Sequence, residues 1–375
     1  MRAVTTISVG LSVFLMLSAA CSGPKEGTGQ TTNDDAQALV QVPHGFAVSI
    51  FAEGLAGVRM LEMGPDGRLY AVRSSAGQIV RFDLNADGTA NGGPAVVVSG
   101  LREPFGLAFL DEDLYVGETH QVVRLTGPAF TQETIIVSGL PTGGHGTREI
   151  EFGPNGRLYV SVGSSCNLCE EADVRRAAVV RYAANGSGEK IIALGLRNTV
   201  GLAFHPETGA LWASQNERDN LGDDVPAEEL NILTPGGPVE HFGWPYCYGN
   251  RVPNPEYADP GRCLGTVPPA LEMQAHSAPL GMVFYDGDQF PVEYRGDLFL
   301  AFHGSWNRSE PTGYKVVRVR VENGQPVSYE DFAAGWLTAS GRVRGRPVAV
   351  EVGPDGSLYV SDDGAGRIWR VRWVG

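Results

Sequence analysis

A few histidines and arginines of this sequence stand where a folded chain could gather them around one ligand. His145 lies between glycines, which leave room for a ligand to approach the imidazole ring closely. Arg197 and its neighbour Asn198 directly precede a short apolar segment. Arg344 and Arg346 precede a similar segment near the C-terminus. Arginines bind carboxylates through paired hydrogen bonds, so a convergence of these side chains favours a carboxylate-bearing ligand.

The segments that must position these residues are copies of one β-hairpin. In each copy, short runs of β-favouring apolar residues flank a tight turn, often Gly-Pro-Asp-Gly or Gly-Pro-Asn-Gly. A third strand, with the pattern Val-Val-Arg or a close variant, follows most copies. Six copies occur along the chain, at residues 63–70, 109–115, 152–159, 204–212, 293–299 and 352–359.

The repeat length indicates a β-propeller. Early copies recur every ~45 residues, which is the length of one four-stranded blade. The last unit has three strands before the chain ends, and a lone strand at 45–51 can complete it. We therefore predict an all-β, six-bladed propeller of antiparallel blades, with the N-terminal strand closing the last blade. Residues just before each first strand then face the central funnel, where the histidine and the arginines would converge.

Two insertions interrupt the regular spacing, at 164–176 and 226–278, and each contains a pair of cysteines. In an oxidising compartment, two local disulfides, Cys166–Cys169 and Cys247–Cys263, are the default expectation. The Cys-x-x-Cys pair is also compatible with a redox-active site or half of a zinc site, although no second such pair accompanies it.

The N-terminus has the features of an export signal. Residues 1–20 contain an early arginine, an apolar run too short to span a membrane, and small residues before Cys21. This arrangement resembles a bacterial lipobox and predicts lipidation of Cys21, with ordinary signal cleavage as the alternative. Residues 21–41 read as a flexible polar tether and 42–375 as the propeller, exported to a periplasmic or cell-surface face.

The charge balance excludes one class of partner. The chain has 29 Lys and Arg against 43 Asp and Glu, a formal net charge of −14. No basic stripe is present, which argues against nucleic-acid binding. We expect the protein to contact a membrane only through its N-terminal lipid.

Several segments together resemble the glucose/sorbosone dehydrogenase family, the soluble pyrroloquinoline quinone (PQQ) dehydrogenases on a six-bladed propeller. The resemblance covers about residues 42–373 and is closest to the sorbosone-dehydrogenase-like branch. The segments that carry it are 196–204 (Leu-Arg-Asn-Thr-Val-Gly-Leu-Ala-Phe), 229–231 (Glu-Leu-Asn), 242–245 (Phe-Gly-Trp-Pro), 164–169 (Ser-Ser-Cys-Asn-Leu-Cys) and 275–279 (Ala-His-Ser-Ala-Pro).

The resemblance implies an activity and a set of roles. His145 matches the general base that takes the substrate hydroxyl proton as hydride passes to PQQ. Four residues match positions that contact the cofactor, the last two by binding its carboxylates: Arg197, Asn198, Arg344 and Arg346. The backbone carbonyls of Glu217 and Arg218 match the Ca²⁺ ligands. The implied substrate is an aldose or sugar aldehyde, and electrons pass to an external acceptor, a cytochrome or a quinone.

The sequence also departs from the glucose enzymes. No lysine stands in the 303–308 segment, and Gly144 and Ser164 replace two aspartates, which argues against glucose specificity. His276, His303 and Trp306 are the candidates to replace the missing cofactor contacts. Two other functions stay open: a cofactor-free binding module on the cell surface, and a Ca²⁺-dependent lactonase-type hydrolase. Both leave the arginines without a role.

Overall fold

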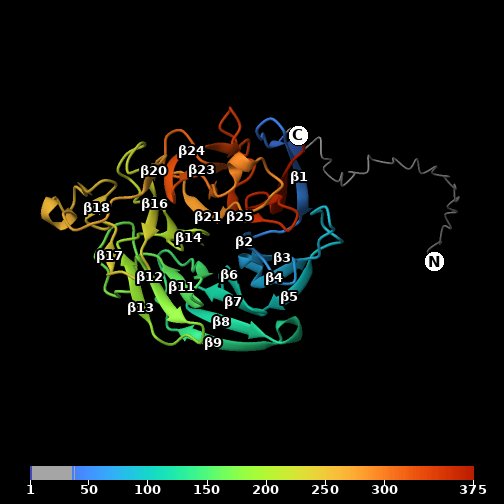
Figure 1. Cartoon of the computed structure of the whole chain (residues 1–375), viewed down its shortest axis with the longest axis horizontal. Helices are drawn as coiled ribbons and strands as arrows, with labels where there is room; N and C mark the ends of the chain where they lie inside the picture. The colour runs from blue at the N-terminus through green and yellow to red at the C-terminus, as the bar shows by residue number, and fades with distance from the viewer. Residues whose placement is uncertain (2–35, 38) are drawn as a thin grey trace. The chain divides into compact units, whose positions relative to one another are not determined.

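The computed structural model describes residue 1 and residues 36–37 and 39–375. The export signal predicted at 1–20, the lipidated Cys21 and most of the tether at 21–41 lie outside the described residues. From residue 36 onward the chain belongs to one compact unit. Small antiparallel sheets form a ring in this unit, and the six-bladed propeller predicted from the repeats is confirmed (Figure 1). No helix in the described part of the chain is long and apolar enough to cross a membrane.

Each blade begins with a strand beside the central axis and ends with a strand at the rim (Figure 1). Blades one and two consist of β2 (Val58–Met63), β3 (Leu69–Arg73), β4 (Gln78–Phe82) and β5 (Ala95–Ser99), then β6 (Pro104–Leu110), β7 (Asp113–Glu118), β8 (Gln121–Thr126) and β9 (Gln132–Ser138). Blade three consists of β10 (Ile150–Phe152), β11 (Arg157–Val162), β12 (Ala178–Ala183) and β13 (Lys190–Leu194).

The second half of the ring follows the same plan. Blade four consists of β14 (Thr199–Phe204), β15 (Leu211–Gln215), β16 (Glu228–Leu233) and β20 (Leu271–Met273). Blade five consists of β21 (Pro279–Phe284), β22 (Leu298–Phe302), β23 (Lys315–Glu322) and β24 (Gln325–Ala333). Blade six consists of β25 (Pro347–Val352), β26 (Leu358–Asp362), β27 (Arg367–Trp373) and β1 (Phe46–Glu53). Short 3₁₀ turns lie in the connections, η1 (Ser74–Ala76), η2 (Pro128–Phe130), η3 (Pro260–Cys263) and η4 (Val292–Tyr294).

The ring closes as the sequence predicted. Strand β1 pairs antiparallel with β27, in a register from Phe46 opposite Trp373 to Glu53 opposite Arg367. The last blade therefore combines strands from both ends of the chain. The pairing with β1 covers the outer edge of β27 and joins the two ends of the ring.

The core lies between neighbouring blades and follows from the repeated hairpin. The tyrosine on the second strand of one blade contacts the phenylalanine that ends the first strand of the next blade. The ring centroids are 5.0 Å apart for Tyr70 and Phe109, 4.8 Å for Tyr115 and Phe152, and 5.2 Å for Tyr159 and Phe204. One sequence motif thus supplies the same edge-on aromatic contact at successive blade interfaces.

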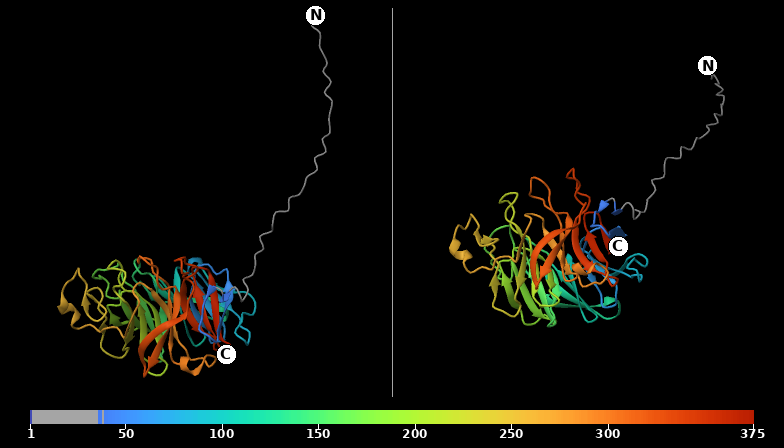
Figure 2. Two further views of the ribbon diagram at one scale, coloured as in Figure 1. Left: turned by 90° about the horizontal axis from the view of Figure 1, so that it is seen from above. Right: turned by 45° about the horizontal axis from the view of Figure 1, so that its top comes forward.

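The extent of the second predicted insertion was wrong. Strands β16 and β20 lie inside the range 226–278 and complete blade four. The pattern was obscured because β16 reads Glu-Glu-Leu-Asn, yet its two glutamates are buried. The true insertion between β16 and β20 holds β17 (Glu240–His241), β18 (Cys247–Tyr248) and β19 (Val252–Pro253). Strand β17 adds to blade three beside β13, whereas the segment around β18 projects beyond the ring (Figures 1 and 2).

Candidate active site

The connections that enter the first strands surround a cavity of about 230 Å³, the funnel pocket. Blades three to six each contribute a predicted site residue to its wall, because these residues stand just before the first strand of a blade or just after its second strand. The structure thereby brings together His145, Arg197, Asn198, Glu217, His276, His303 and Arg346.

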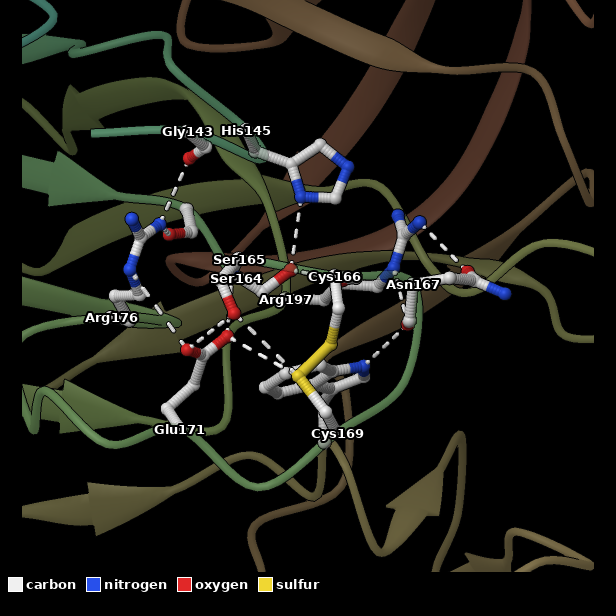
Figure 3. The surroundings of a disulfide bond; sticks show 12 residues. Gly143, His145, Ser164, Ser165, Cys166, Asn167, Cys169, Glu171, Arg176 and Arg197 are labelled. Carbon is white, nitrogen blue, oxygen red and sulfur yellow. Dashed lines mark hydrogen bonds and ion pairs between the residues drawn. A yellow bond between two sulfur atoms is a disulfide. The ribbon is translucent and has the colours of Figure 1, made fainter. Parts of the chain in front are cut away.

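The His145 imidazole is fixed in one tautomer by the loop that follows β11. Its Nδ1 lies 2.9 Å from Ser164 Oγ, and that hydroxyl donates a 2.7 Å hydrogen bond to the Cys166 carbonyl (Figure 3). Because a carbonyl only accepts, the Ser164 oxygen accepts the Nδ1 proton, and the imidazole lone pair resides on Nε2. Burial, and after it the positive charge of Arg197, lowers the pKa of His145 to about 4. His145 is therefore a neutral base in the pocket wall.

The backbone before His145 requires glycine. Gly144 has a φ of 62°, and a side chain there would run into the backbone of Ser164 and Ser165. Gly144 stands where the glucose enzymes have an aspartate, and the close approach of the two loops leaves room only for a glycine there.

Arg197 is 3% exposed, and all five of its N–H groups are used. Its guanidinium donates to the backbone and side-chain oxygens of Asn167, at 3.1 and 2.9 Å, and to the Asp219 carboxylate at 2.9 Å. The remaining bonds go to the carbonyls of Asn216 and Glu217, at 3.1 and 2.8 Å. Arg197 consequently offers a ligand its charge and its planar face, but no free pair of donors.

Arg346 is in the opposite situation. Two of its five N–H groups donate to the carbonyls of His303 and Gly304, at 3.3 and 3.1 Å. Within the described chain, no carboxylate lies within 4 Å of this guanidinium. Its charge is not neutralised and its remaining donors are available, which suits an anionic ligand.

A second arginine supports this side of the pocket. Arg59, in β2, lies 2.5 Å from Asp363, and His303 Nε2 lies 2.9 Å from the other oxygen of that carboxylate. Burial lowers the pKa of His303. Burial alone would raise the pKa of Asp363, but His303 and Arg59 outweigh it and the net shift is downward.

Two buried glutamates form the opposite wall. Glu228 accepts backbone hydrogen bonds from Glu217 and Ala278, at 2.7 and 3.0 Å. Burial raises the pKa of Glu217 and raises that of Glu228 to about 8. Two side-chain oxygens are buried and unpartnered within the described residues: Asn198 Oδ1, whose residue also lines the pocket, and Gln215 Oε1, two residues before Glu217. These oxygens are hard donors of the kind that Ca²⁺ prefers.

Two predicted site residues do not line the pocket. Arg344 is exposed and borders a separate cavity of about 400 Å³, with Trp336 and Trp369. The reason is Gly345, which packs against Asp362 and Trp336 and turns the chain between the two arginines. Arg218 was predicted to act through its backbone carbonyl, and its side chain pairs with Glu256 at 2.6 Å. The expectation that Arg344 and Arg346 converge is therefore corrected.

Both cysteine pairs are bonded in the structure, Cys166 to Cys169 and Cys247 to Cys263. The sulfurs of the first pair lie beside Glu171, but as a disulfide they offer no thiolate to a metal. His276 Nε2 lies 2.7 Å from the Gly222 carbonyl oxygen. This side chain therefore lines the funnel pocket and also holds the loop that contains Gly222.

Sequence reasoning missed several residues of the pocket wall. Thr147 and Asn307 have buried polar side-chain atoms without a partner in the described residues, and Arg59 adds a positive charge. Arg59 carried a usable signal, because it is the second residue of the first strand of blade one, close to where the other arginines precede theirs. Arg59 and Thr147 also border a cavity of about 960 Å³, the side cavity, which therefore adjoins the funnel pocket.

The fold and this pocket define a class: a β-propeller whose axis holds a half-buried base, an arginine with uncommitted donors and carboxylates around a polar cavity. The chain belongs to the TrAA12-like family, which it matches over residues 40–257 and 252–374.

The chain is also similar to individual proteins and to solved structures. An uncharacterised protein of Borreliella burgdorferi is 30% identical over 358 residues, which cover 90% of this chain and 92% of that protein. The PQQ-dependent pyranose dehydrogenase of Coprinopsis cinerea is 24% identical over 89% of this chain, which spans 54% of the length of that enzyme. The calcium structure of a Trichoderma reesei family AA12 enzyme superposes with a TM-score of 0.78 at 22% identity. It covers 89% of this chain and 97% of that one, and supports the fold.

Proposed function

We propose that this chain is a PQQ-dependent dehydrogenase that oxidises an aldose or a sugar aldehyde and passes the electrons to an external cytochrome or quinone. The names of its relatives support the reaction class. The observation that carries the proposal is the funnel pocket, where the neutral base His145 and the unneutralised Arg346 line one cavity.

The residues present fit PQQ, which is a tricarboxylate. Arg346 offers free donors, and polar atoms of three further residues in the wall are buried without a partner in the described structure: Thr147, Asn198 and Asn307. Buried polar groups ordinarily have partners, so these atoms favour a polar ligand. The cofactor would supply the two-electron acceptor for the substrate hydride.

The opposite wall fits Ca²⁺. Glu217 and Glu228 are both buried; Arg197 brings positive charge close to both, and Arg218 brings a further positive charge close to Glu217. The Glu217 carbonyl uses one lone pair for Arg197 and keeps the other. We propose that this carbonyl and that of Arg218 hold the ion, with Asn198 Oδ1 as a further oxygen donor.

In this proposal the chain's own residues perform the proton chemistry. His145 Nε2 takes the proton of the substrate hydroxyl, since Nδ1 is committed to Ser164. Burial, and after it the positive charge of Arg197, keeps the imidazole neutral beforehand, because both disfavour the imidazolium. The side cavity next to the pocket gives the sugar an approach to His145.

The organisation of the chain is part of the same proposal. Residues 1–20 would direct export, Cys21 would carry the lipid, 21–41 would tether, and 42–375 would form the catalytic propeller on the periplasmic or outer face. Mass spectrometry of the N-terminal peptide from membranes tests the lipid directly.

The decisive experiment titrates the purified protein with PQQ and Ca²⁺ and follows dye reduction against aldoses and sugar aldehydes. Activity is expected only with both additions. His145→Ala should lower the rate about a hundredfold to ten-thousandfold while PQQ still binds, because the base acts in the chemical step. Absence of PQQ binding to the wild-type protein would overturn the proposal. Hydrolysis of lactones with Ca²⁺ alone would support the hydrolase alternative.

A further inference from the structure

The loop closed by the Cys166–Cys169 disulfide, here residues 164–171, contacts the funnel pocket at two points (Figure 3). At its first residue, Ser164 holds the His145 imidazole. At its middle, Asn167 holds Arg197. The loop therefore touches both the base and the buried cation of the pocket.

Asn167 makes an unusually complete set of bonds for a loop residue. Its side-chain oxygen accepts from Arg197 at 2.9 Å and from the Asp219 amide at 2.8 Å. Its side-chain nitrogen donates to the Asp219 carbonyl at 3.0 Å. Its backbone oxygen accepts from Arg197 and from the Trp244 indole, both at 3.1 Å. The side chain thus joins two residues of the pocket wall that come from different connections of blade four.

The disulfide and its surroundings restrict how this loop can move. Cys166 lies two residues after Ser164 and one before Asn167, and Cys169 lies two residues after Asn167. Glu171 anchors the same loop through Ser165 N at 2.6 Å and Ser165 Oγ at 2.8 Å. Arg176 lies 3.9 Å from Glu171 and donates to the Gly143 carbonyl, two residues before His145. A covalent closure across so short a loop limits the conformations open to Asn167.

We propose that Asn167 is a positioning residue: it fixes Arg197 and Asp219 against each other, and the disulfide holds it in place to do so. The inference rests on the proposed function. Its consequence is that cofactor affinity depends on Asn167, whereas the chemical step, which uses His145, does not.

The test compares Asn167→Ala with the wild-type protein in PQQ titrations at saturating Ca²⁺. Loss of the bond to a charged partner is expected to weaken PQQ binding about tenfold to a hundredfold. The turnover number at saturating PQQ should stay within about twofold, since Ser164 still orients the base. Asn185→Ala, at an exposed turn of blade three, is the matched control and should change neither quantity.

A second readout needs no cofactor. Hydrogen exchange of the Asp219 amide, followed in peptides covering residues 215–222, should be faster in Asn167→Ala, because that amide loses its acceptor. This measurement separates the two proposals: if wild-type protein fails to bind PQQ, the proposed function fails, whereas unchanged exchange in the variant removes the positioning role.

The disulfide is tested by Cys166→Ser/Cys169→Ser, with Cys247→Ser/Cys263→Ser as the matched pair in the projecting insertion. Weaker PQQ binding in the first variant alone supports the proposal, and this variant also serves if Asn167→Ala does not fold. Equal PQQ affinity in Asn167→Ala and the wild type, or equal losses in both cysteine variants, would overturn it.

Discussion

His145 shows how a single hydroxyl can decide what a histidine does. The Ser164 hydroxyl has one hydrogen, which it donates in a hydrogen bond to the Cys166 carbonyl. The imidazole must therefore donate its Nδ1–H to the Ser164 oxygen. A carboxylate at position 164 would accept from the same Nδ1, but it would also favour the charged imidazolium. The serine therefore keeps the orientation of the ring without placing a negative charge beside it.

The pH dependence of catalysis is expected to reflect this arrangement. With the pKa of His145 lowered to about 4, the neutral base is present above that value, so kcat/KM should fall only as pH drops through about 4. Ser164→Asp should move this acid limb to higher pH, because a neighbouring negative charge stabilises the imidazolium. Pre-steady-state or steady-state pH profiles measure the limb.

Ser340→Asp, at an exposed position before β25, adds the same charge far from the pocket and should leave the profile unchanged. A wild-type limb near 6.5, the ordinary value for histidine, would contradict the assignment of His145 as a buried base.

At the scale of elements, β1 closes the ring and carries an aromatic anchor. Phe46 lies edge-on to four rings of blades five and six, with centroid distances of 4.8 Å to Phe290, 5.2 Å to Tyr294, 5.1 Å to Phe332 and 4.9 Å to Trp373. The N-terminal strand is thus joined to its neighbours by the backbone ladder with β27 and by packing across the interface to blade five.

Phe46→Ala should lower the free energy of unfolding by about 3–5 kcal/mol, because it leaves a cavity among these rings. Chemical denaturation monitored by tryptophan fluorescence measures the loss. Val96→Ala, on the exposed outer strand β5, should cost less than about 0.5 kcal/mol. A loss equal to that of the control would mean that β1 contributes little to closure.

At the scale of the whole molecule, the propeller axis is acidic at the end away from the funnel pocket. A cavity of about 280 Å³ there is bordered by Glu62, Glu149, Glu151 and Glu351, which come from blades one, three and six. Three of them stand at the same repeat position, one residue before the end of the first strand. Burial, followed by mutual repulsion among neighbours, raises the pKa of Glu62, and burial raises those of Glu151 and Glu351 to about 8.

Because of these glutamates, the free energy of unfolding is expected to fall as pH rises. A carboxyl whose pKa is higher in the folded than in the unfolded state holds its proton in the fold, and this contribution is lost between about pH 4.5 and 8. Glu351→Gln, which mimics the protonated form, should therefore stabilise the protein by about 1–3 kcal/mol at pH 8 and have no effect below pH 4.5. Thermal unfolding across this range measures the difference, with the exposed Glu322→Gln as the control. A pH-independent effect would contradict the assignment.

Much of the fold was readable in the sequence because one hairpin recurs six times, and its turn glycines, apolar runs and Val-Val-Arg strands repeat with it. The blade count, the closure by β1 and most first strands follow from that repetition. Strand β16 did not, because two of its buried positions are glutamates, whose burial depends on partners supplied by other blades and loops.

The sequence by itself determined which chemical groups stand at the entries to the blades: the histidine, the arginines and the asparagine of the pocket. The tertiary structure decided which of them share a cavity and in what state. In the fold, Arg344 and Arg346 border different cavities, because Gly345 between them packs against blade six. Every N–H group of Arg197 is hydrogen-bonded to neighbouring residues. The tertiary structure also brought in Asn167, whose role comes from bonds to Arg197 and Asp219, 30 and 52 residues further along the chain. Local patterns record the type and order of residues, whereas contacts between residues this far apart form only when blades three and four pack together.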